Sequence, residues 1–182
     1  VDFVINSDSI IFENGIRERF ELNNAIDYFI FMNLTRPTDN TGKNIYIAKY
    51  DTHEPYFYIP WDLDGTFGLD YKGRLSNTTD DMLTNGLYDR LIISKSIIFN
   101  NGASNRWFYL RNNLLKESNL IYNISSEYNF LVRNGNYTRE RLKWGQESID
   151  LSILEYTYEW LNDRIEFLDA YFSFHILGIN GN

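Results

Sequence analysis

The sequence lacks cysteine altogether and contains only two histidines among its 182 residues. Disulfide frameworks and thiolate metal sites are therefore excluded, and a histidine-rich zinc site is not expected. Basic residues are also scarce, since 17 Lys and Arg stand against 25 Asp and Glu, giving a net charge of -8. Nucleic-acid binding needs clustered cations that neutralise phosphates, so we expect no nucleic-acid partner. An acidic surface does suit an enzyme that works with a divalent cation.

Long hydrophobic runs are missing as well. The longest run, residues 28–32, is far shorter than the roughly 20 residues that cross a bilayer, so no membrane span is expected. The chain starts at Val1 without a charged and then apolar leader, which leads us to expect a fragment of a longer protein. With 43% hydrophobic residues, a chain of this length is expected to form one domain with a substantial core.

The first half of the chain predicts a helix, a loop and a hairpin. Residues 21–34 contain no Gly or Pro and are apolar on more than one face, which indicates a buried helix that ends before Pro37. Residues 35–43 have the composition of a polar loop. Two strand-like runs follow, residues 45–50 and 56–60, and the short turn between them favours a β-hairpin.

The second half is predicted to be a loop followed by helices. A polar stretch over residues 70–84 is typical of a loop, and helices are expected around 107–115 and 120–132. The last helix is the clearest, because apolar residues recur at steps of three and four and form one stripe: Leu151, Leu154, Tyr158, Leu161, Ile165, Leu168 and Phe172. The predicted fold class is therefore a mostly helical α+β domain spanning residues 1–182.

Three oxygen-bearing side chains are expected to meet at one end of the hairpin. Asp39 lies in the polar loop, Asn44 ends that loop, and Asp62 follows the second strand. Because a hairpin returns the chain to its starting end, Asp62 should lie beside the other two. Carboxylate and amide oxygens suit magnesium, which completes its coordination with waters and substrate phosphates. The Asp-x-x-x-x-Asn spacing and the later Asp follow the order used by protein kinases.

Three motifs carry a resemblance to a known family. They are Leu-Asn-Asn-Ala-Ile-Asp-Tyr at residues 22–28, Asp-Asn-Thr-Gly-Lys-Asn-Ile-Tyr-Ile at 39–47 and Pro-Trp-Asp-Leu-Asp at 60–64. With them, the stretch from about Phe20 to Gly68 resembles the C-terminal lobe of the CotH kinase family, the atypical protein kinases related to a spore coat protein. The resemblance implies a kinase-like fold whose hairpin carries the metal and catalytic residues, and ATP with Mg²⁺ or Mn²⁺ as cofactors. It also implies Ser/Thr phosphorylation of extracytoplasmic or coat proteins.

The resemblance also implies a role for each motif residue. Asp39 corresponds to the catalytic base that orients the attacking hydroxyl, while Asn44 and Asp62 correspond to metal ligands. Asp64 would share a strand face with Asp62, since alternate residues do so, and is expected to be a further ligand or a cap of the next turn. Lys43 is expected either to contact a transferring phosphate of the nucleotide or to be solvated.

Two kinase features are absent before Asp39. The preceding residues, Thr35 to Thr38, contain no His-Arg pair, and neither a Gly-rich phosphate loop nor a strand Lys with a partner Glu can be recognised. Those parts belong to the N-terminal lobe of a kinase. We therefore expect an upstream lobe of the same protein to be needed, and the present chain to be poorly active alone.

Other interpretations remain open at this point. An Asp and an Asn in a polar loop often serve as caps or Asx-turns. We expect Trp61 to be buried, and two acids beside a buried aromatic would be costly to desolvate without cations, which favours the metal site. A non-catalytic adhesion or scaffold module with the same fold is the main alternative function. Metal-dependent hydrolysis of a phosphate ester is a third, less favoured because two-metal hydrolases need more ligands.

Overall fold

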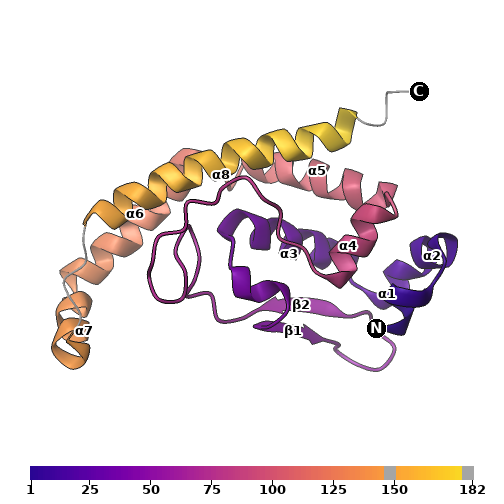
Figure 1. Ribbon diagram of the computed structural model, residues 1–182, viewed down its shortest axis with the longest axis horizontal. Coiled ribbons are helices and arrows are strands. Elements are labelled where there is room, and N and C mark those ends of the chain that lie inside the picture. Colours follow the sequence, from indigo (N-terminus) through magenta and orange to yellow (C-terminus); the bar gives the residue numbers. More distant parts are fainter. Residues whose placement is uncertain (146–150, 178–182) are drawn as a thin grey trace.

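The computed structural model describes residues 1–145 and 151–177, and shows a mostly helical α+β fold with a small two-stranded antiparallel sheet (Figure 1). In the described residues, no helix is both long and apolar enough to cross a membrane. The elements in chain order are α1 (Asp2–Asn6), α2 (Ser9–Arg19), α3 (Leu22–Thr35), the 3₁₀ helix η1 (Thr38–Thr41), β1 (Ile45–Ala48), β2 (Phe57–Pro60), α4 (Gly86–Ile93), α5 (Ile97–Asn112), α6 (Glu117–Arg133), α7 (Asn136–Trp144) and α8 (Leu151–Leu177).

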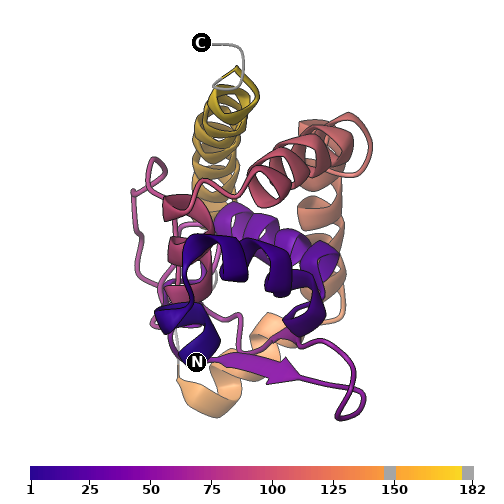
Figure 2. The same cartoon turned by 90° about the vertical axis from the view of Figure 1, so that its right-hand side faces the viewer.

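Helix α3 is the centre of the molecule, as its composition predicts. Ten of its 14 residues are buried, because it is covered on several sides. In Figure 2, α3 lies between the hairpin on one side and α5 and α8 on the other. The helix ends where Arg36 adopts a left-handed conformation, with φ of 53°, just before Pro37. The predicted helix of residues 21–34 is therefore confirmed to within one residue at each end.

The core joins α3 to α5 and α8 through large aromatic side chains. Phe29 of α3 contacts Phe99 of α5 and Phe172 of α8, and Trp107 stacks on Phe172 with ring centroids 5.2 Å apart. The predicted stripe of α8 is confirmed for Leu161, Ile165, Leu168 and Phe172, which are at most 5% exposed. Leu154 and Tyr158 are only half-buried, and the side chain of Leu151 lies outside the described residues.

The hairpin is confirmed, but its strands are shorter than predicted. β1 ends at Ala48 and β2 starts at Phe57, with Ile45 paired to Pro60 and Ala48 to Phe57. The second edge of β2 is held by α3 rather than by a third strand. The Asn24 side chain accepts from the Tyr58 amide at 2.7 Å and donates to its carbonyl at 3.1 Å, as a neighbouring strand would.

The region from Trp61 to Asn85 contains no helix and no strand of the sheet, which confirms the loop predicted over residues 70–84. Helices α6 and α7 project from one end of the molecule and contain no fully buried residue (Figure 1). Helices α1 and α2 were not predicted from the sequence. α2 begins at an Asp8 cap, whose carboxylate accepts from the Ile11 amide, and it buries Phe12 and Ile16.

Candidate functional site

The loop that carries Asp39 is a short 3₁₀ helix rather than an irregular loop. Asp39 is partly exposed within η1, and its carboxylate forms an ion pair with Lys43 at 2.8 Å. This hydrogen bond and the charge of Asp39 raise the pKa of Lys43, and the charge of Asp62 adds to the effect. Lys43 is therefore ion-paired with Asp39, while its side chain remains 70% exposed.

The hairpin register brings Asn44 next to the end of β2. Since Ile45 pairs with Pro60, the preceding Asn44 lies opposite Trp61, and Asp62 follows directly. Asn44 and Asp62 both have left-handed backbone, with φ of 57° and 56°. Asn and Asp tolerate this conformation better than other residues that carry a side chain, yet it is uncommon, and strained residues cluster at functional sites. The two predicted ligands thus share one end of the sheet and the same unusual conformation.

Asn40 joins the two halves of this site, and sequence reasoning missed it. Its side chain is 1% exposed, and its Nδ2 donates to the carbonyl oxygens of Asn44 at 2.9 Å and of Trp61 at 2.7 Å. A single buried amide therefore fixes the η1 loop to the residue before Asp62. The sequence shows only one more Asn in a polar loop, so nothing in it distinguishes Asn40 from its exposed neighbours.

Two predictions about the end of β2 are wrong. Trp61 is 57% exposed and makes a T-shaped ring contact with Tyr46. Asp62 and Asp64 therefore do not lie beside a buried aromatic residue, and a need for a cation does not follow from such burial. Asp62 and Asp64 do not share a strand face, because β2 ends at Pro60 and the left-handed residue at Asp62 interrupts the alternation of an extended strand. Asp64 is exposed, and only its place in the chain connects it with the site.

The carboxylates of Asp62 and Asp64 form no hydrogen bond or ion pair with any described residue. Across residues 1–145 and 151–177, no three acidic or histidine side chains lie close enough to hold a metal ion. The donor set of Asn44 and Asp62, with Asp39 nearby, is therefore too small for a metal bound by protein alone. It does fit magnesium that arrives with a nucleotide, because phosphates and waters supply the remaining ligands.

An apolar cavity of about 550 Å³ adjoins the same loop. Thr41 and Gly42 of the η1 end form part of its wall. The rest comes from α1, the residue that follows α2, the hairpin and the start of α4, including Val4, Phe20, Ile45, Ile47, Tyr58 and Leu87. Its volume falls in the range of pockets that hold small molecules and cofactors. No pattern in the sequence predicted this cavity, since its walls come from five separate segments.

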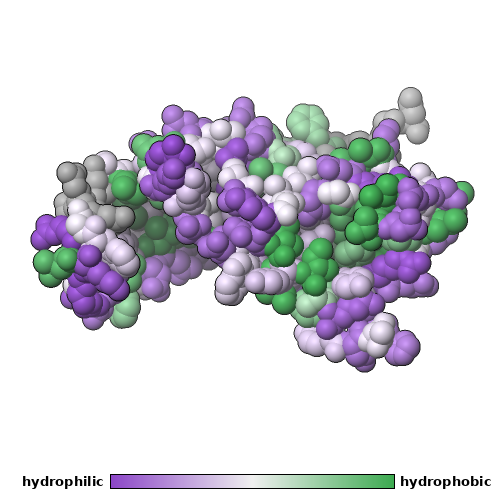
Figure 3. All heavy atoms as spheres, turned by 60° about the horizontal axis from the view of Figure 1, so that its bottom comes forward, coloured by the Kyte–Doolittle hydropathy of each residue, from purple (hydrophilic) through white to green (hydrophobic). Residues whose placement is uncertain are grey.

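Hydrophobic side chains are also exposed on the hairpin. Tyr46, Ile47, Ile59 and Trp61 are between 39% and 57% exposed. In Figure 3, which turns the hairpin side of the molecule forward, hydrophobic residues form separate patches among hydrophilic ones. The site thus lies on a surface with exposed apolar residues and unpaired carboxylates.

Comparison with known proteins agrees with the motifs. Residues 1–172 match the model of a protein family described as CotH kinase protein. The match covers most of the chain, and so includes the helices that follow the three motifs. No curated protein matches the sequence.

Proposed function

Because the chain belongs to the CotH kinase family, we propose that it transfers a phosphoryl group from ATP to Ser or Thr hydroxyls of a protein, with a divalent metal as cofactor. Membership of the family supports a kinase-like enzyme. The observation that carries the finer proposal is the Asn40 amide, which ties the Asp39 loop to the end of β2. This contact supports a site in which Asp39, Asn44 and Asp62 act together, in the chain order that protein kinases use.

Each residue has a distinct task in this proposal. Asp39 accepts the proton of the attacking hydroxyl and orients its oxygen, while Asn44 and Asp62 hold the metal with the nucleotide phosphates. When bound, the metal would neutralise the charge that develops on the transferring group. Asp64 is proposed as an outer ligand, through water. Lys43, which is paired with Asp39, can exchange that partner for a phosphate oxygen.

The apolar cavity beside Thr41 and Gly42 is proposed to receive the nucleotide base. Its hydrophobic walls suit a flat heteroaromatic ring, and its position next to η1 leaves the phosphates near Asn44. The exposed hydrophobic residues of the hairpin are proposed to contact an upstream lobe of the same protein. That lobe would exclude water from the site, which strengthens the electrostatic interactions there.

Asp62→Asn tests the metal site with minimal change of shape. Asn tolerates left-handed backbone, and the Asp62 carboxylate forms no hydrogen bond or ion pair with a described residue, so folding should be unaffected. We expect the thermal stabilisation by ATP with magnesium to disappear, and transfer by a chain that includes the upstream lobe to fall by about a hundredfold or more. Asp51→Asn, in the exposed hairpin turn, is the control and should behave as wild type. Full activity of D62N would refute the assignment of Asp62.

A non-catalytic adhesion or scaffold module is the second candidate, and one observation favours it. One oxygen of the Asp39 carboxylate is already engaged by Lys43 at 2.8 Å, so it is not open to a substrate hydroxyl. If this role is correct, a double variant, Asp39→Asn with Asp62→Ala, should bind its cell-surface partner as tightly as wild type. Loss of phosphoryl transfer in the same variant would instead support the enzyme.

A further inference from the structure

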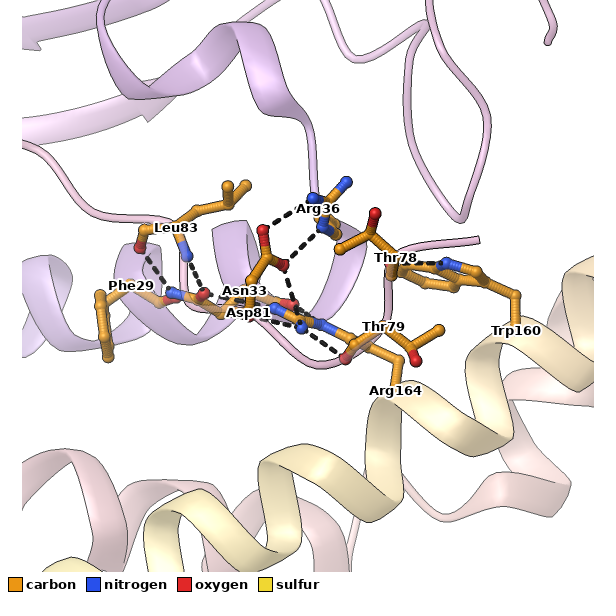
Figure 4. A network of polar contacts seen from close by, with 9 residues as sticks. All are labelled: Phe29, Asn33, Arg36, Thr78, Thr79, Asp81, Leu83, Trp160 and Arg164. Carbon is orange, nitrogen blue, oxygen red and sulfur yellow. Dashed lines mark hydrogen bonds and ion pairs between the residues drawn. The ribbon is translucent and has the colours of Figure 1, made fainter. Parts of the chain in front are cut away.

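Helix α8 holds the loop that follows the site by its backbone. Tyr156, Trp160 and Arg164 are spaced four residues apart, so they lie on one face of the helix. Each donates hydrogen bonds to loop carbonyls: Tyr156 to Gly68 and Ser76, Trp160 to Thr78, and Arg164 to Thr79 and Asp81, at 2.6 to 3.1 Å. Figure 4 shows the Trp160 and Arg164 part of this ladder. At these positions α8 holds the loop by its backbone, whatever side chains the loop carries there.

Arg164 also completes the end of α3. The carbonyl of Asn33 would normally accept from the amide four residues later, but that residue is Pro37, which has no N–H. Arg164 replaces the missing donor, since its Nε lies 2.7 Å from the Asn33 oxygen. The guanidinium is fully buried, and burial lowers the pKa of Arg164 to about 10.

Asp81 connects this anchor to the corner between α3 and the site. Its carboxylate binds the Arg36 guanidinium in a bidentate pair, with both distances 2.7 Å, and lies 3.7 Å from Arg164 (Figure 4). One carboxylate therefore neutralises two arginines whose side chains are 11% and 0% exposed. A bidentate pair fixes the orientation of Arg36 as well as its charge.

The corner held by Asp81 leads directly into the catalytic loop. Arg36 has the left-handed backbone that turns the chain out of α3, and Asp39 follows three residues later. The segment leaving the site returns to the same corner, because the Phe67 amide donates to the Thr35 carbonyl at 2.8 Å. The chain therefore passes this corner both before Asp39 and after Asp64.

We propose that Asp81 is a positioning residue for Asp39. It locks the Arg36 corner and so fixes the distance of the η1 loop from the phosphates, although it touches no reactant itself. This inference rests on the proposed phosphoryl transfer. The pair fixes Arg36, which lies three residues before the proposed base, so its restraint acts where the chain enters the η1 loop.

The test compares Asp81→Asn and Arg36→Lys with Asp80→Asn. R36K keeps the charge but loses the bidentate geometry, so it remains informative if D81N does not fold. Asp80 is the exposed neighbour, and its side chain forms no hydrogen bond with a described residue. Hydrogen exchange is followed at the Asn40 and Lys43 amides, which donate to the Pro37 and Asp39 carbonyls around η1, and at the β1 and β2 amides as a reference.

In D81N and R36K, we expect the η1 amides to exchange about tenfold faster while the hairpin amides keep their wild-type rates. Unchanged exchange in η1, or equal acceleration in both regions, would overturn the inference. This readout needs no catalysis, so it stays decisive even if the wild-type protein transfers no phosphoryl group and the proposed function fails.

Kinetics provide the second readout. In a chain with the upstream lobe, both variants should lower kcat by about tenfold to a hundredfold, because small displacements of a catalytic group have effects of this size. The KM for ATP with magnesium should stay within about twofold of wild type, since Asn44 and Asp62 do not contact Asp81. Parallel losses in kcat and in ATP binding would contradict a positioning role, and D80N should match wild type.

Discussion

Two polar regions flank the C-terminal end of α3, and they are built in opposite ways. Around Arg164, buried donors meet backbone acceptors at hydrogen-bonding distance, and the guanidinium is fully buried. The exposed carboxylates of Asp62 and Asp64 form no hydrogen bond or ion pair with a described residue, and the backbone of Asp62 is left-handed. The first region uses its polar groups to hold the fold together. The second leaves its groups free to bind something else.

The buried cation of the first region and the exposed carboxylates of the second should differ in how much they contribute to folding stability. A buried cation is tolerated only when its hydrogen-bonding capacity is met, so the Arg164 region is expected to be intolerant of substitution. Exposed carboxylates without partners add little to folding stability, so the Asp62 region should accept substitution without unfolding. Stability measurements and binding measurements should therefore respond to different residues.

The largest effect is expected for Arg164→Met. Methionine fills similar space but leaves the carbonyls of Asn33, Thr79 and Asp81 without their donor, which should destabilise the protein by about 3 to 5 kcal/mol. Urea denaturation followed by circular dichroism measures this change. Arg133→Met on the exposed face of α6 is the control and should change stability by less than about 0.5 kcal/mol. A small effect at Arg164 would break the contrast between the regions.

A smaller loss is expected for Gly68→Ala. Gly68 has φ of 80°, and a Cβ atom there would lie 2.7 Å from the Trp160 indole ring. Strain and overlap together should cost about 2 to 3 kcal/mol. Gly73→Ala is the matched control, because its φ is 72° but no atom lies within 4 Å, so only the backbone strain of about 1 kcal/mol should appear. Equal losses in the two variants would mean that the fit against α8 is unimportant.

At the candidate site, Asp62→Gly should separate stability from binding. Glycine removes the cost of left-handed backbone at φ of 56°, so the free energy of unfolding should rise by up to about 1 kcal/mol. The same variant should lose its thermal shift with ATP and magnesium. Asp64→Gly is the control: its φ is not positive, so glycine should lower stability slightly. A destabilised D62G protein would show that the carboxylate has a structural partner.

The smallest effect is a pH dependence that comes from Asp81. The Arg36 guanidinium lowers the pKa of this carboxyl below its ordinary value, so its stabilising contribution is complete above that value and lost as the pH falls through the folded-state pKa. The stability gap between wild type and Asp81→Asn should therefore be constant above about pH 5 and shrink below about pH 4. Because the side chain is 42% exposed, the change should stay below about 1 kcal/mol.

Urea denaturation of both proteins would measure this gap. The pH should run from about 2.5 to about 6, which spans the ordinary pKa of Asp. Asp70 also has a lowered pKa because of Arg74, but it titrates in both proteins and its contribution cancels in the difference. A gap that grows as the pH falls would contradict the ion pair between Asp81 and Arg36.

The sequence by itself determined the elements whose signals are local. Helix α3, the hairpin and the stripe of α8 follow from hydrophobic periodicity and from Pro and polar interruptions, which depend on neighbouring residues only. The three motifs also indicated the family that the match over residues 1–172 shows. The proximity of Asn44 to the end of β2 was predictable too, because a hairpin must return the chain.

Only the tertiary structure decided how the polar groups are paired. The Asn33 carbonyl accepts from a residue 131 positions away in the chain, and Asn40 reaches Trp61 over 21 positions. Nothing near Arg164 in the sequence marks it as buried within an apolar stripe, nor does the motif around Asp62 reveal its left-handed backbone. The physical reason is that a polar side chain is buried only when acceptors are brought to it, and folding, not local sequence, supplies those acceptors.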